Sequence, residues 1–351
     1  MLMSVQEYVD WMTRLGRFGE SAAAPEHDPR VCTRYLQLHA RWLGGPLEAP
    51  VVVVPGGLGF YRDPLAGGGA FAWALVGALS HPVVPLAAPE IAAAAEAVAI
   101  ALADDCGDSQ VMTDTFEAEG LSEPTAPNGE CFAWLSSPRA RFDGTFSEYL
   151  ASLSADRRRA ARELLARFDE SAGFRFVLTP EAPSEAELTW VAEQLTRQWG
   201  EDAAYALAQH LWPVAVAEVR PGQALFMRVY AGDQLAYFNG YLVRGAVITS
   251  QSTSRNLDLH HDGLGVVIDL LAIARLIDAF PAVRRLDPTC RTGLDDPPSI
   301  GVAKRKVVNE NAYKPALLIG APTPECAAGC PYFAPGQGWV AGTAGIVGRR
   351  L

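Results

Sequence analysis

Apolar and polar residues alternate most regularly between positions 224 and 254. Three β-rich runs, ALFMRVY, QLAYFNGYLV and AVITSQSTS, are separated by glycine-containing turns at 231–233 and 244–245. Alternation with a period of two is typical of half-buried strands, and turns this short join neighbouring antiparallel strands. The pattern therefore predicts a three-stranded antiparallel meander.

Helical patterns come before this meander. Thr145-x-x-Glu148 and Ser184-x-x-Glu187 have the form of capping boxes, and apolar residues recur at helical spacing after each of them. Between them, the arginine-rich segment 154–173 predicts a further helix, followed by a short strand FRFVL. The expected order is therefore helix, strand, helix and three antiparallel strands.

The first part of the chain is rich in Ala, Gly and Pro and has a weaker pattern. Residues 1–18 indicate an amphipathic helix, and VVVVP at 51–55 indicates a buried strand. The alanine-rich segment 89–105 predicts a helix, and the turn formers at 119–130 predict a linker or a long loop.

After the meander, the sequence NLDLHHDGLGVVIDLLAIARLIDAF at 256–280 combines a polar turn with an apolar helix that starts near Gly263 and Gly265. The first N–H groups of a helix lack partners within the helix and lie at the positive end of its dipole. Glycine lets the backbone bend and lets an anion approach closely. The segment fits a pyrophosphate cradle, and it equally fits a tight turn with glycines at positive φ.

Composition and charge narrow the class of protein. The chain has 351 residues, of which 49% are hydrophobic, and a net charge of −11. Prolines and glutamates interrupt the longest apolar run at 82–103, so we expect a cytoplasmic protein without a membrane span. The negative charge disfavours a broad nucleic-acid surface, because phosphate binding requires clustered Lys and Arg. The six cysteines are scattered, and Cys326 and Cys330 lack a second Cys/His pair, so we expect no metal.

The order of elements, completed by a short strand VRRLDPTC at 283–290, resembles the GNAT N-acyltransferase superfamily. The pyrophosphate signature of that family is Gln or Arg, two residues, Gly, one residue, and Gly or Ala. The segment HHDGLG at 260–265 has both glycines, with His260 in the first position. Segments 146–176 and 225–245 and the sequence NAYKPALL at 311–318 resemble the branch related to the Fem-type peptidyltransferases.

This resemblance implies an α/β (α+β) GNAT fold, a mixed and mostly antiparallel sheet flanked by helices. It also implies two tandem GNAT-like domains, with the N-terminal copy degenerate. The expected boundaries are 1–140 for the degenerate domain, 141–320 for the acyltransferase domain and 321–351 for a C-terminal extension.

The resemblance also implies a donor site for acyl-CoA, in which a backbone N–H of the third meander strand meets the acyl carbonyl. That strand splays from the next one, and the acyl group enters the gap. The residues expected to bind the donor are Gln251, Ser252, Gly263, Leu264, Gly265 and Val266. Independently of the resemblance, Lys304 begins the basic cluster 304–306, which can meet phosphates of CoA or of an RNA end, or can simply be solvated.

Acid–base groups and the acceptor site follow from the same resemblance. His260 and His261 titrate in the right range for catalysis, although adjacent loop histidines are commonly just solvated. Asp287 can orient an amine, or it can be a turn residue before a proline. Tyr237 and Asn239 are expected to wall the acceptor site, and the same alternation occurs in any half-buried strand.

Three functions remain open at this point. We expect an N-acyltransferase that moves an acyl group from acyl-CoA to an amine of a small molecule. The alternatives are an aminoacyl-tRNA-dependent transferase of Fem type, with charged tRNA as the donor, and a non-catalytic GNAT-like binding protein. An oxidoreductase is excluded because the Gly-x-Gly lacks a third glycine and follows an antiparallel meander. The acceptor and the oligomeric state stay undetermined.

Overall fold

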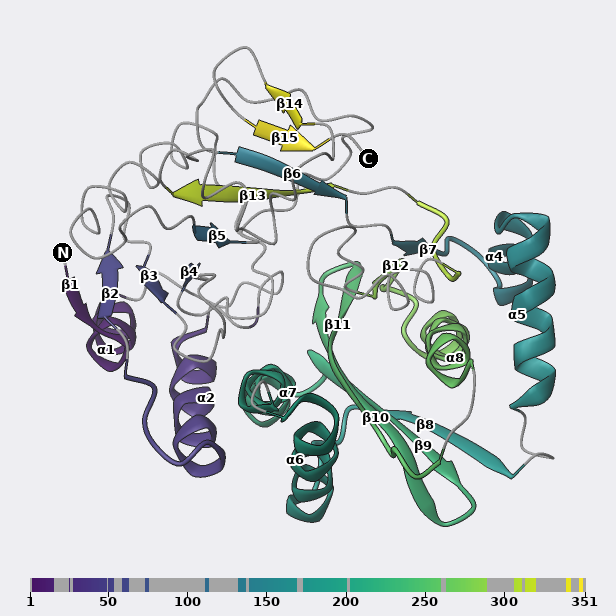
Figure 1. Cartoon of the computed structure of the whole chain (residues 1–351), viewed down its shortest axis with the longest axis horizontal. Helices are drawn as coiled ribbons and strands as arrows, with labels where there is room; N and C mark the ends of the chain where they lie inside the picture. Colours follow the sequence, from purple (N-terminus) through teal and green to yellow (C-terminus); the bar gives the residue numbers. More distant parts are fainter. Residues whose placement is uncertain are drawn as a thin grey trace. The chain divides into compact units, whose positions relative to one another are not determined.

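Figure 1 shows the computed structural model of the chain. The structure describes residues 2–15, 25, 28–48, 50–53, 59–62, 73–75, 111–113, 132–136, 139–168, 173–200, 203–259, 263–288, 306–310, 313–319, 339–341 and 347–349. The chain divides into two compact units. Unit 1 comprises Met1–Ser137, Arg291–Asp296 and Ala312–Leu351, and unit 2 comprises Pro138–Cys290 and Pro297–Asn311.

The described residues of unit 1 form a four-stranded antiparallel sheet and two helices, together with the strands given below. Its strands, in spatial order, are β1 (Leu2–Ser4), β2 (Pro50–Val53), β3 (Gly59–Arg62) and β4 (Trp73–Leu75). The helices are α1 (Val5–Leu15) and α2 (Pro29–Trp42), which contact each other. The predicted N-terminal amphipathic helix and the strand at 51–55 are confirmed.

A second sheet of unit 1 joins distant parts of the sequence. β13 (Tyr313–Ile319) lies between β5 (Val111–Thr113) and β6 (Phe132–Ser136) and is antiparallel to both. β14 (Trp339–Ala341) pairs with β15 (Val347–Arg349). The Tyr-Lys segment at 311–318 thus contributes a strand to unit 1. The predicted tandem GNAT-like domains and their boundaries remain a prediction.

Two expectations for the first part of the chain lie outside the described residues. These are the alanine-rich helix at 89–105 and the linker or long loop at 119–130.

Unit 2 contains a six-stranded mixed sheet. Its strands are β7 (Ala140–Arg141), β8 (Phe174–Thr179), β9 (Ala224–Ala231), β10 (Gln234–Arg244), β11 (Val247–Arg255) and β12 (Arg285–Asp287). They lie in the order β7-β12-β11-β10-β9-β8, and all pairs are antiparallel except β11 with β12. This topology confirms the predicted fold class, a mixed and mostly antiparallel sheet flanked by helices.

The meander β9–β10–β11 can form because each of its two tight turns has glycine at the position that requires a positive φ. Gly232 has φ of 59° and Gly245 has φ of 58°, in the left-handed region that glycine enters readily. These turns fix the register of three long strands, and the predicted strand limits agree with the structure to within one residue.

Five described helices of unit 2 pack around its sheet. They are α4 (Phe146–Ser152), α5 (Ala155–Arg167), α6 (Glu185–Trp199), α7 (Ala203–Val219) and α8 (Leu264–Ala279). Both predicted capping boxes form, at Thr145 for α4 and at Ser184 for α6. Ser154 precedes α5 without a side-chain capping bond.

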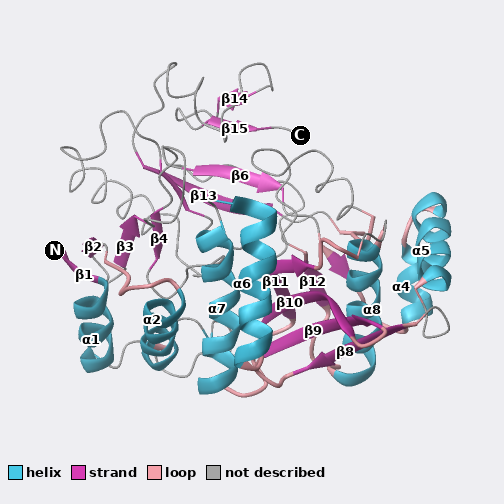
Figure 2. Cartoon of the chain, turned by 60° about the horizontal axis from the view of Figure 1, so that its bottom comes forward, coloured by secondary structure: helices cyan, strands magenta, loops and turns pink. Residues whose placement is uncertain are grey.

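The helices of unit 2 cover both faces of its sheet. Figures 1 and 2 show α8, with α4 and α5 beside it, on one face, and α6 with α7 on the other. α8 contacts β8 and β9 from its side, whereas α7 contacts β9, β10 and β11 from the opposite side. Among the described residues, no helix is long and apolar enough to cross a membrane.

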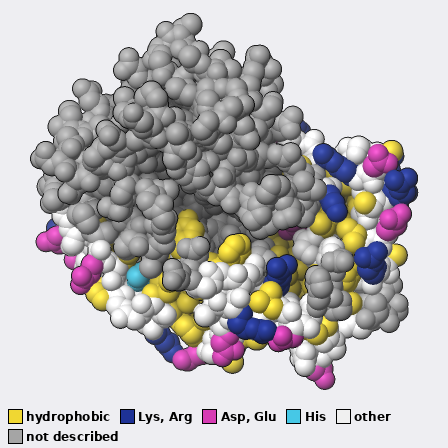
Figure 3. Space-filling view, viewed as in Figure 1, with side chains coloured by type: hydrophobic (Ala, Val, Ile, Leu, Met, Phe, Trp, Pro, Cys, Tyr) yellow, Lys and Arg dark blue, Asp and Glu magenta, His cyan; other side chains and the backbone are white. Residues whose placement is uncertain are grey.

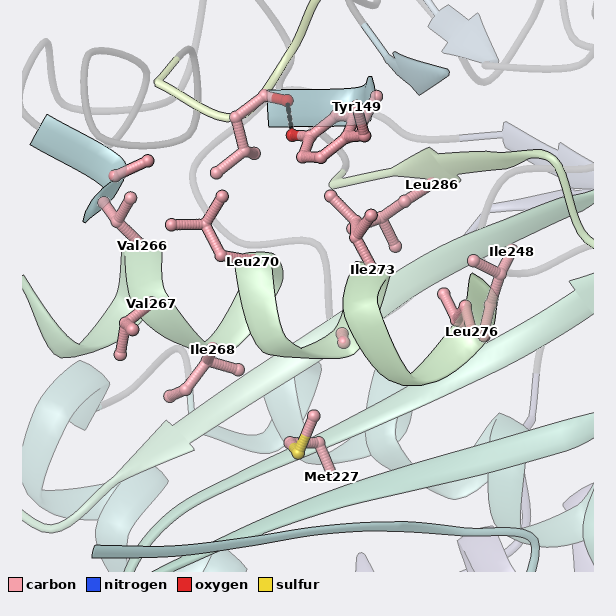
Figure 4. Packing of buried hydrophobic residues seen from close by; sticks show 14 of the residues in the cluster. Tyr149, Met227, Ile248, Val266, Val267, Ile268, Leu270, Ile273, Leu276 and Leu286 are labelled. Carbon is pink, nitrogen blue, oxygen red and sulfur yellow. Dashed lines mark hydrogen bonds between the residues drawn. The ribbon is translucent and has the colours of Figure 1, made fainter. Parts of the chain in front are cut away.

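The core of unit 2 lies between α8 and the sheet. In Figure 4, Ile268 and Leu276 of α8 point toward the side of Met227 and Ile248, and all four are buried. On the other side of α8, Tyr149 of α4 donates a hydrogen bond to the carbonyl oxygen of Val307. Burial of these side chains fixes α8 against the sheet and against α4.

Candidate functional site

β11 extends well beyond its parallel neighbour. The pairs that join β11 to β12 are Val247 with Arg285, Ile248 with Leu286 and Thr249 with Asp287. β11 continues to Arg255, so from Ser250 onward it pairs only with β10 among the described strands. Among the described strands, none pairs with the second backbone edge of β11 from Ser250 onward, where the predicted acyl contact lies.

A β-bulge occurs at the same place on β11. Asn239 and Tyr241 of β10 pair with Thr253 and Ser250, so two steps along β10 correspond to three along β11. The additional residue lies within 251–252 and interrupts the ladder. A bulge leaves one residue unpaired and turns its backbone and side chain in a new direction.

Gln251 occupies this bulge and is 9% exposed. Its Nε2 donates to the carbonyl oxygen of Thr249 at 3.4 Å, and its Oε1 is buried without a hydrogen-bond partner in the described structure. A buried acceptor without a partner is unfavourable, so this oxygen is available to an incoming donor. The side chain of Ser252 lies outside the described residues.

The two residues predicted to wall the acceptor site bond across to β11. Asn239 is buried, and its Nδ2 donates to Oγ of Ser250 at 2.9 Å. The hydroxyl of Tyr237 donates to Oγ1 of Thr253 at 3.2 Å. These bonds join β10 to β11 on both sides of the bulge and hold it in place.

Asp269 of α8 is a buried carboxylate that the sequence reading missed. Burial, and then the negative charge of Asp269, raises the pKa of the hydroxyls of Tyr149, Tyr237 and Tyr241. The carboxylate of Asp269 therefore acts on tyrosines of both α4 and β10, the elements that carry these three residues. The sequence does contain a signal for it, because Asp269 is a single acid inside the apolar run GVVIDLLAI. Acids are rarely buried, so one within a run that is expected to be buried indicates a special role.

α8 begins without a capping side chain. Its N-cap residue is Gly263, at φ of 89°. The N–H groups of Val266 and Val267 both donate to the carbonyl oxygen of Gly263 at 3.1 Å. The amides of Gly263, Leu264 and Gly265 precede them, at the positive end of the helix dipole. The side chains of Leu264 and Val266 are buried, so only the backbone of these two residues can face a ligand.

The two glycines of the predicted cradle have different surroundings. A Cβ on Gly263 would overlap Cδ2 of Leu164 on α5, and its φ disfavours any other residue. A Cβ on Gly265 would meet no atom of the described residues within 4 Å, and Gly265 is exposed. The backbone conformation and the packing against Leu164 are therefore sufficient to explain why residue 263 is glycine, without a ligand. The fold places no steric demand on Gly265, which leaves space above the first turn of α8.

Some predicted site residues lie outside the described part of the chain. These are His260, His261 and Lys304. Their roles in catalysis and in donor binding remain predictions.

Asp287 lies at the end of β12 and is fully buried. Its Oδ2 lies 3.7 Å from Nε of Arg139, which is 5% exposed, and its paired residue on β11 is Thr249. Its predicted role in orienting an amine remains a prediction. The sequence reading missed Arg139, because 148 residues separate the two partners and no local pattern connects them.

A second buried polar pair lies on the other face of the sheet. Nε2 of His210 on α7 lies 3.1 Å from Oγ of Ser254 on β11, and both residues are almost fully buried. Burial lowers the pKa of His210 to about 3, so the imidazole is neutral at physiological pH. The sequence reading did not predict this pair.

A shallow surface hollow of about 420 Å³ lies elsewhere on unit 2. Its lining residues are Arg141, Phe142, Asp143, Gly144, Glu148, Tyr149, Ser152 and Asn309. It shares no residue with the predicted donor and acceptor sites. Asn309 bonds Arg141 and Ser152 there, so its polar groups have partners within the protein.

Metal ligands do not cluster in the described part of the chain. Among those residues, no group of three or more His, Cys, Asp or Glu side chains is placed to hold a metal ion.

The sequence matches no family model and no curated protein. Among solved structures, L-PGS from Bacillus licheniformis is 12% identical with a TM-score of 0.46, over 84% of this chain and 92% of that chain. A tandem GNAT protein from the clavulanic acid biosynthesis pathway is 15% identical with a TM-score of 0.39, over 90% and 97%. FemX is 10% identical with a TM-score of 0.39, over 90% and 96%.

GNAT and Fem proteins are thus among the similar structures, as the resemblance predicted. With identities and TM-scores this low, neither the fold nor a substrate follows from these likenesses.

Proposed function

We propose that unit 2 is an acyltransferase domain that moves an acyl group from acyl-CoA to an amine of a small molecule. The observation that carries this proposal is the course of β11. Its bulge at 251–252 follows directly after its last pair with β12. The same strand then leads to the glycine start of α8. The backbone N–H proposed to polarise the acyl carbonyl and the helix start proposed to bind the phosphates thus lie at the two ends of one short segment.

The donor phosphates are proposed to lie at the start of α8. The amides before Val266 and the positive end of the helix dipole favour an anion there. Gly265 supports this placement because the space beside it is open. Lys304 is proposed to add a positive charge at the same phosphates.

The acyl group is proposed to lie beside the bulge. A backbone N–H at 251–252 would donate to the thioester carbonyl oxygen and stabilise the negative charge that develops on it. The amine attacks the carbonyl carbon directly, the C–S bond breaks, and the CoA thiolate leaves and is protonated. His260 or His261 would accept the proton from the amine.

The acceptor amine is proposed to lie near Tyr237, Asn239 and Asp287. Both Tyr237 and Asn239 are buried and bonded to β11 in this structure, and Asp287 lies beside Arg139. Their proposed role is therefore to shape the end of the site and to orient the amine.

A second candidate donor is aminoacyl-tRNA, as in the Fem-type resemblance. The observation that favours it is α5, which carries five arginines and two acids. Figure 3 shows Lys and Arg side chains, mixed with acids, on the side where Figure 1 places α4 and α5. Several of these arginines already have partners within the protein. Arg157 donates to the carbonyl oxygen of Val308, and Arg158 donates to that of Ala151. We therefore prefer acyl-CoA.

Thermal unfolding with each donor tests the proposal. A ligand at a hundredfold excess over its Kd stabilises the folded state by about 2.7 kcal/mol, which shifts Tm by a few degrees. We expect acetyl-CoA to raise Tm and uncharged and charged tRNA to leave it unchanged. A response to charged tRNA alone would favour the Fem-type reaction. No response to either donor would favour a non-catalytic binding protein.

A further inference from the structure

The chain that leaves β11 is folded into a defined turn before it reaches α8. The N–H of Asn256 donates to the carbonyl oxygen of Ala236 at 2.8 Å, which continues the ladder with β10. The side-chain Oδ1 of Asn256 then accepts from the N–H of Asp258 at 2.9 Å. Leu259 closes the turn with a 3.3 Å bond from its N–H to the carbonyl oxygen of Asn256.

Two side chains of α6, a separate element of unit 2, form hydrogen bonds to this turn. Arg197 donates from Nη1 and Nη2 to the two carboxylate oxygens of Asp258, at 2.9 and 2.7 Å. Oε1 of Gln194 accepts from the N–H of Leu257 at 3.3 Å. A bidentate arginine–carboxylate pair fixes orientation as well as distance. We call Gln194 and Arg197 the α6 clamp.

Gln194 belongs to the buried face of α6. It is 6% exposed and lies between Val191 and Leu195, which are fully buried. An amide in such a position is unfavourable unless its polar atoms are bonded. Its bond to the loop amide, far away in sequence, accounts for a polar residue on this apolar face.

The other end of the segment is also held. Gly263 lies against Leu164 of α5, so a substitution there would meet that side chain. The described residues on both sides of 260–262 are therefore anchored, by α6 before and by α5 after. The start of α8 is positioned by elements from both faces of the sheet.

We propose that Gln194 and Arg197 are positioning residues for the donor, which hold the turn at 256–259 so that the first amides of α8 face the donor phosphates. The inference rests on the proposed function. Amides held in place before binding lose less freedom when the ligand binds, which strengthens binding without adding a contact.

The charge of Asp258 makes this inference testable. The carboxylate lies five residues before Gly263 in the sequence, and hydrogen bonds from Arg197 lower its pKa, so it is ionised at neutral pH. On electrostatic grounds alone, removing a negative charge should strengthen the binding of a polyanionic donor. If Asp258 acts through the clamp, its removal should instead weaken donor binding.

The experiment measures the Kd of acetyl-CoA by calorimetry for wild type, Arg197→Ala, Asp258→Asn and the double variant. We expect each single variant to raise Kd by about three- to tenfold, with the double variant no worse than the singles. Arg197→Lys should restore part of the affinity. Arg159→Ala is the matched control, because Arg159 also pairs with an acid on an exposed helix surface and should leave Kd unchanged.

Hydrogen exchange tests the clamp without any ligand. In Arg197→Ala, the amides of 257–259 and of the first turn of α8 should exchange faster, while those of β9 and β10 stay protected. Unchanged exchange at 257–259, or tighter acetyl-CoA binding by Asp258→Asn, would overturn the inference. A wild-type protein that binds no acetyl-CoA, with faster exchange in the variant, would contradict the proposed function instead.

Discussion

In unit 2, α4 and α6 begin in a different way from α8. α4 and α6 start with capping boxes, in which Thr145 and Ser184 accept from the amides of Glu148 and Glu187 and the glutamates bond back. α8 starts at Gly263, which has no side chain and holds the backbone at φ of 89°. In α4 and α6, the side chain of the N-cap residue accepts a hydrogen bond from an amide of the first turn. In α8, no N-cap side chain does so, and the proposed partner of its first amides is the donor.

Under the proposed function, this difference separates helix starts that only stabilise the fold from one that binds the donor. A capping box contributes stability and prevents access to the amides behind it. A glycine start supplies no side-chain acceptor for those amides and so leaves room for a ligand beside them. Changes at the two kinds of start should therefore have different effects, with stability affected at one and donor binding at the other.

The largest effect is expected from Gly263→Val. Valine strongly disfavours positive φ, and its Cβ would overlap Leu164. We expect a loss of about 3 kcal/mol in the free energy of unfolding, measured by urea denaturation. The double variant Leu164→Ala/Gly263→Ala removes the overlap but keeps the strain. Wild-type stability of Gly263→Val would show that the start of α8 is not held as described.

The pH dependence of stability comes next. His210 is neutral when folded, with its pKa lowered to about 3 by burial, while the unfolded chain has an ordinary histidine pKa near 6.5. Below pH 6.5 the unfolded state binds a proton that the folded state does not. Stability should therefore fall with a slope that approaches about 1.4 kcal/mol per pH unit, or by roughly 2 kcal/mol between pH 6.5 and 4.5.

Urea denaturation of wild type and His210→Leu across this range isolates the contribution of His210. The variant should lose this part of the slope. An unchanged slope would assign the pH dependence to other groups. The result also bears on the comparison of helix starts. At low pH, donor binding can fall because His260 or His261 is protonated or because less protein is folded, and the stability curve separates these two causes.

A smaller effect is expected at a capping box. Ser184→Ala removes the oxygen that accepts from the amide of Glu187 and should cost about 1 kcal/mol. Chemical denaturation measures this cost, and acetyl-CoA titration of the same variant should give the wild-type Kd. A changed Kd would contradict the division between structural and binding helix starts.

Local patterns predicted most elements of unit 2. The meander was predictable because its strands alternate with a period of two and end at glycine-containing turns. α4 and α6 were predictable because the two residues of each capping box lie three positions apart in the sequence. α7 was missed, since it is buried almost all round and contains Pro213, so it has neither an apolar stripe nor an uninterrupted helical pattern.

The candidate site was only partly predictable. The strand, the glycines and the start of α8 follow from local sequence. The bulge at 251–252, the ion pair of Arg139 with Asp287, and the α6 clamp join residues that are distant in sequence or depend on register. Such contacts arise from tertiary packing, which a single sequence does not display.

Gly265→Val tests the central claim most directly. Its side chain would enter open space on an exposed turn, so the free energy of unfolding should change by less than about 1 kcal/mol. The added side chain should nevertheless block an anion at the first amides of α8. We predict that acetyl-CoA raises Tm of the wild type and leaves Tm of the folded variant unchanged. An equal rise in both proteins would contradict the assignment of α8 as the donor-binding helix.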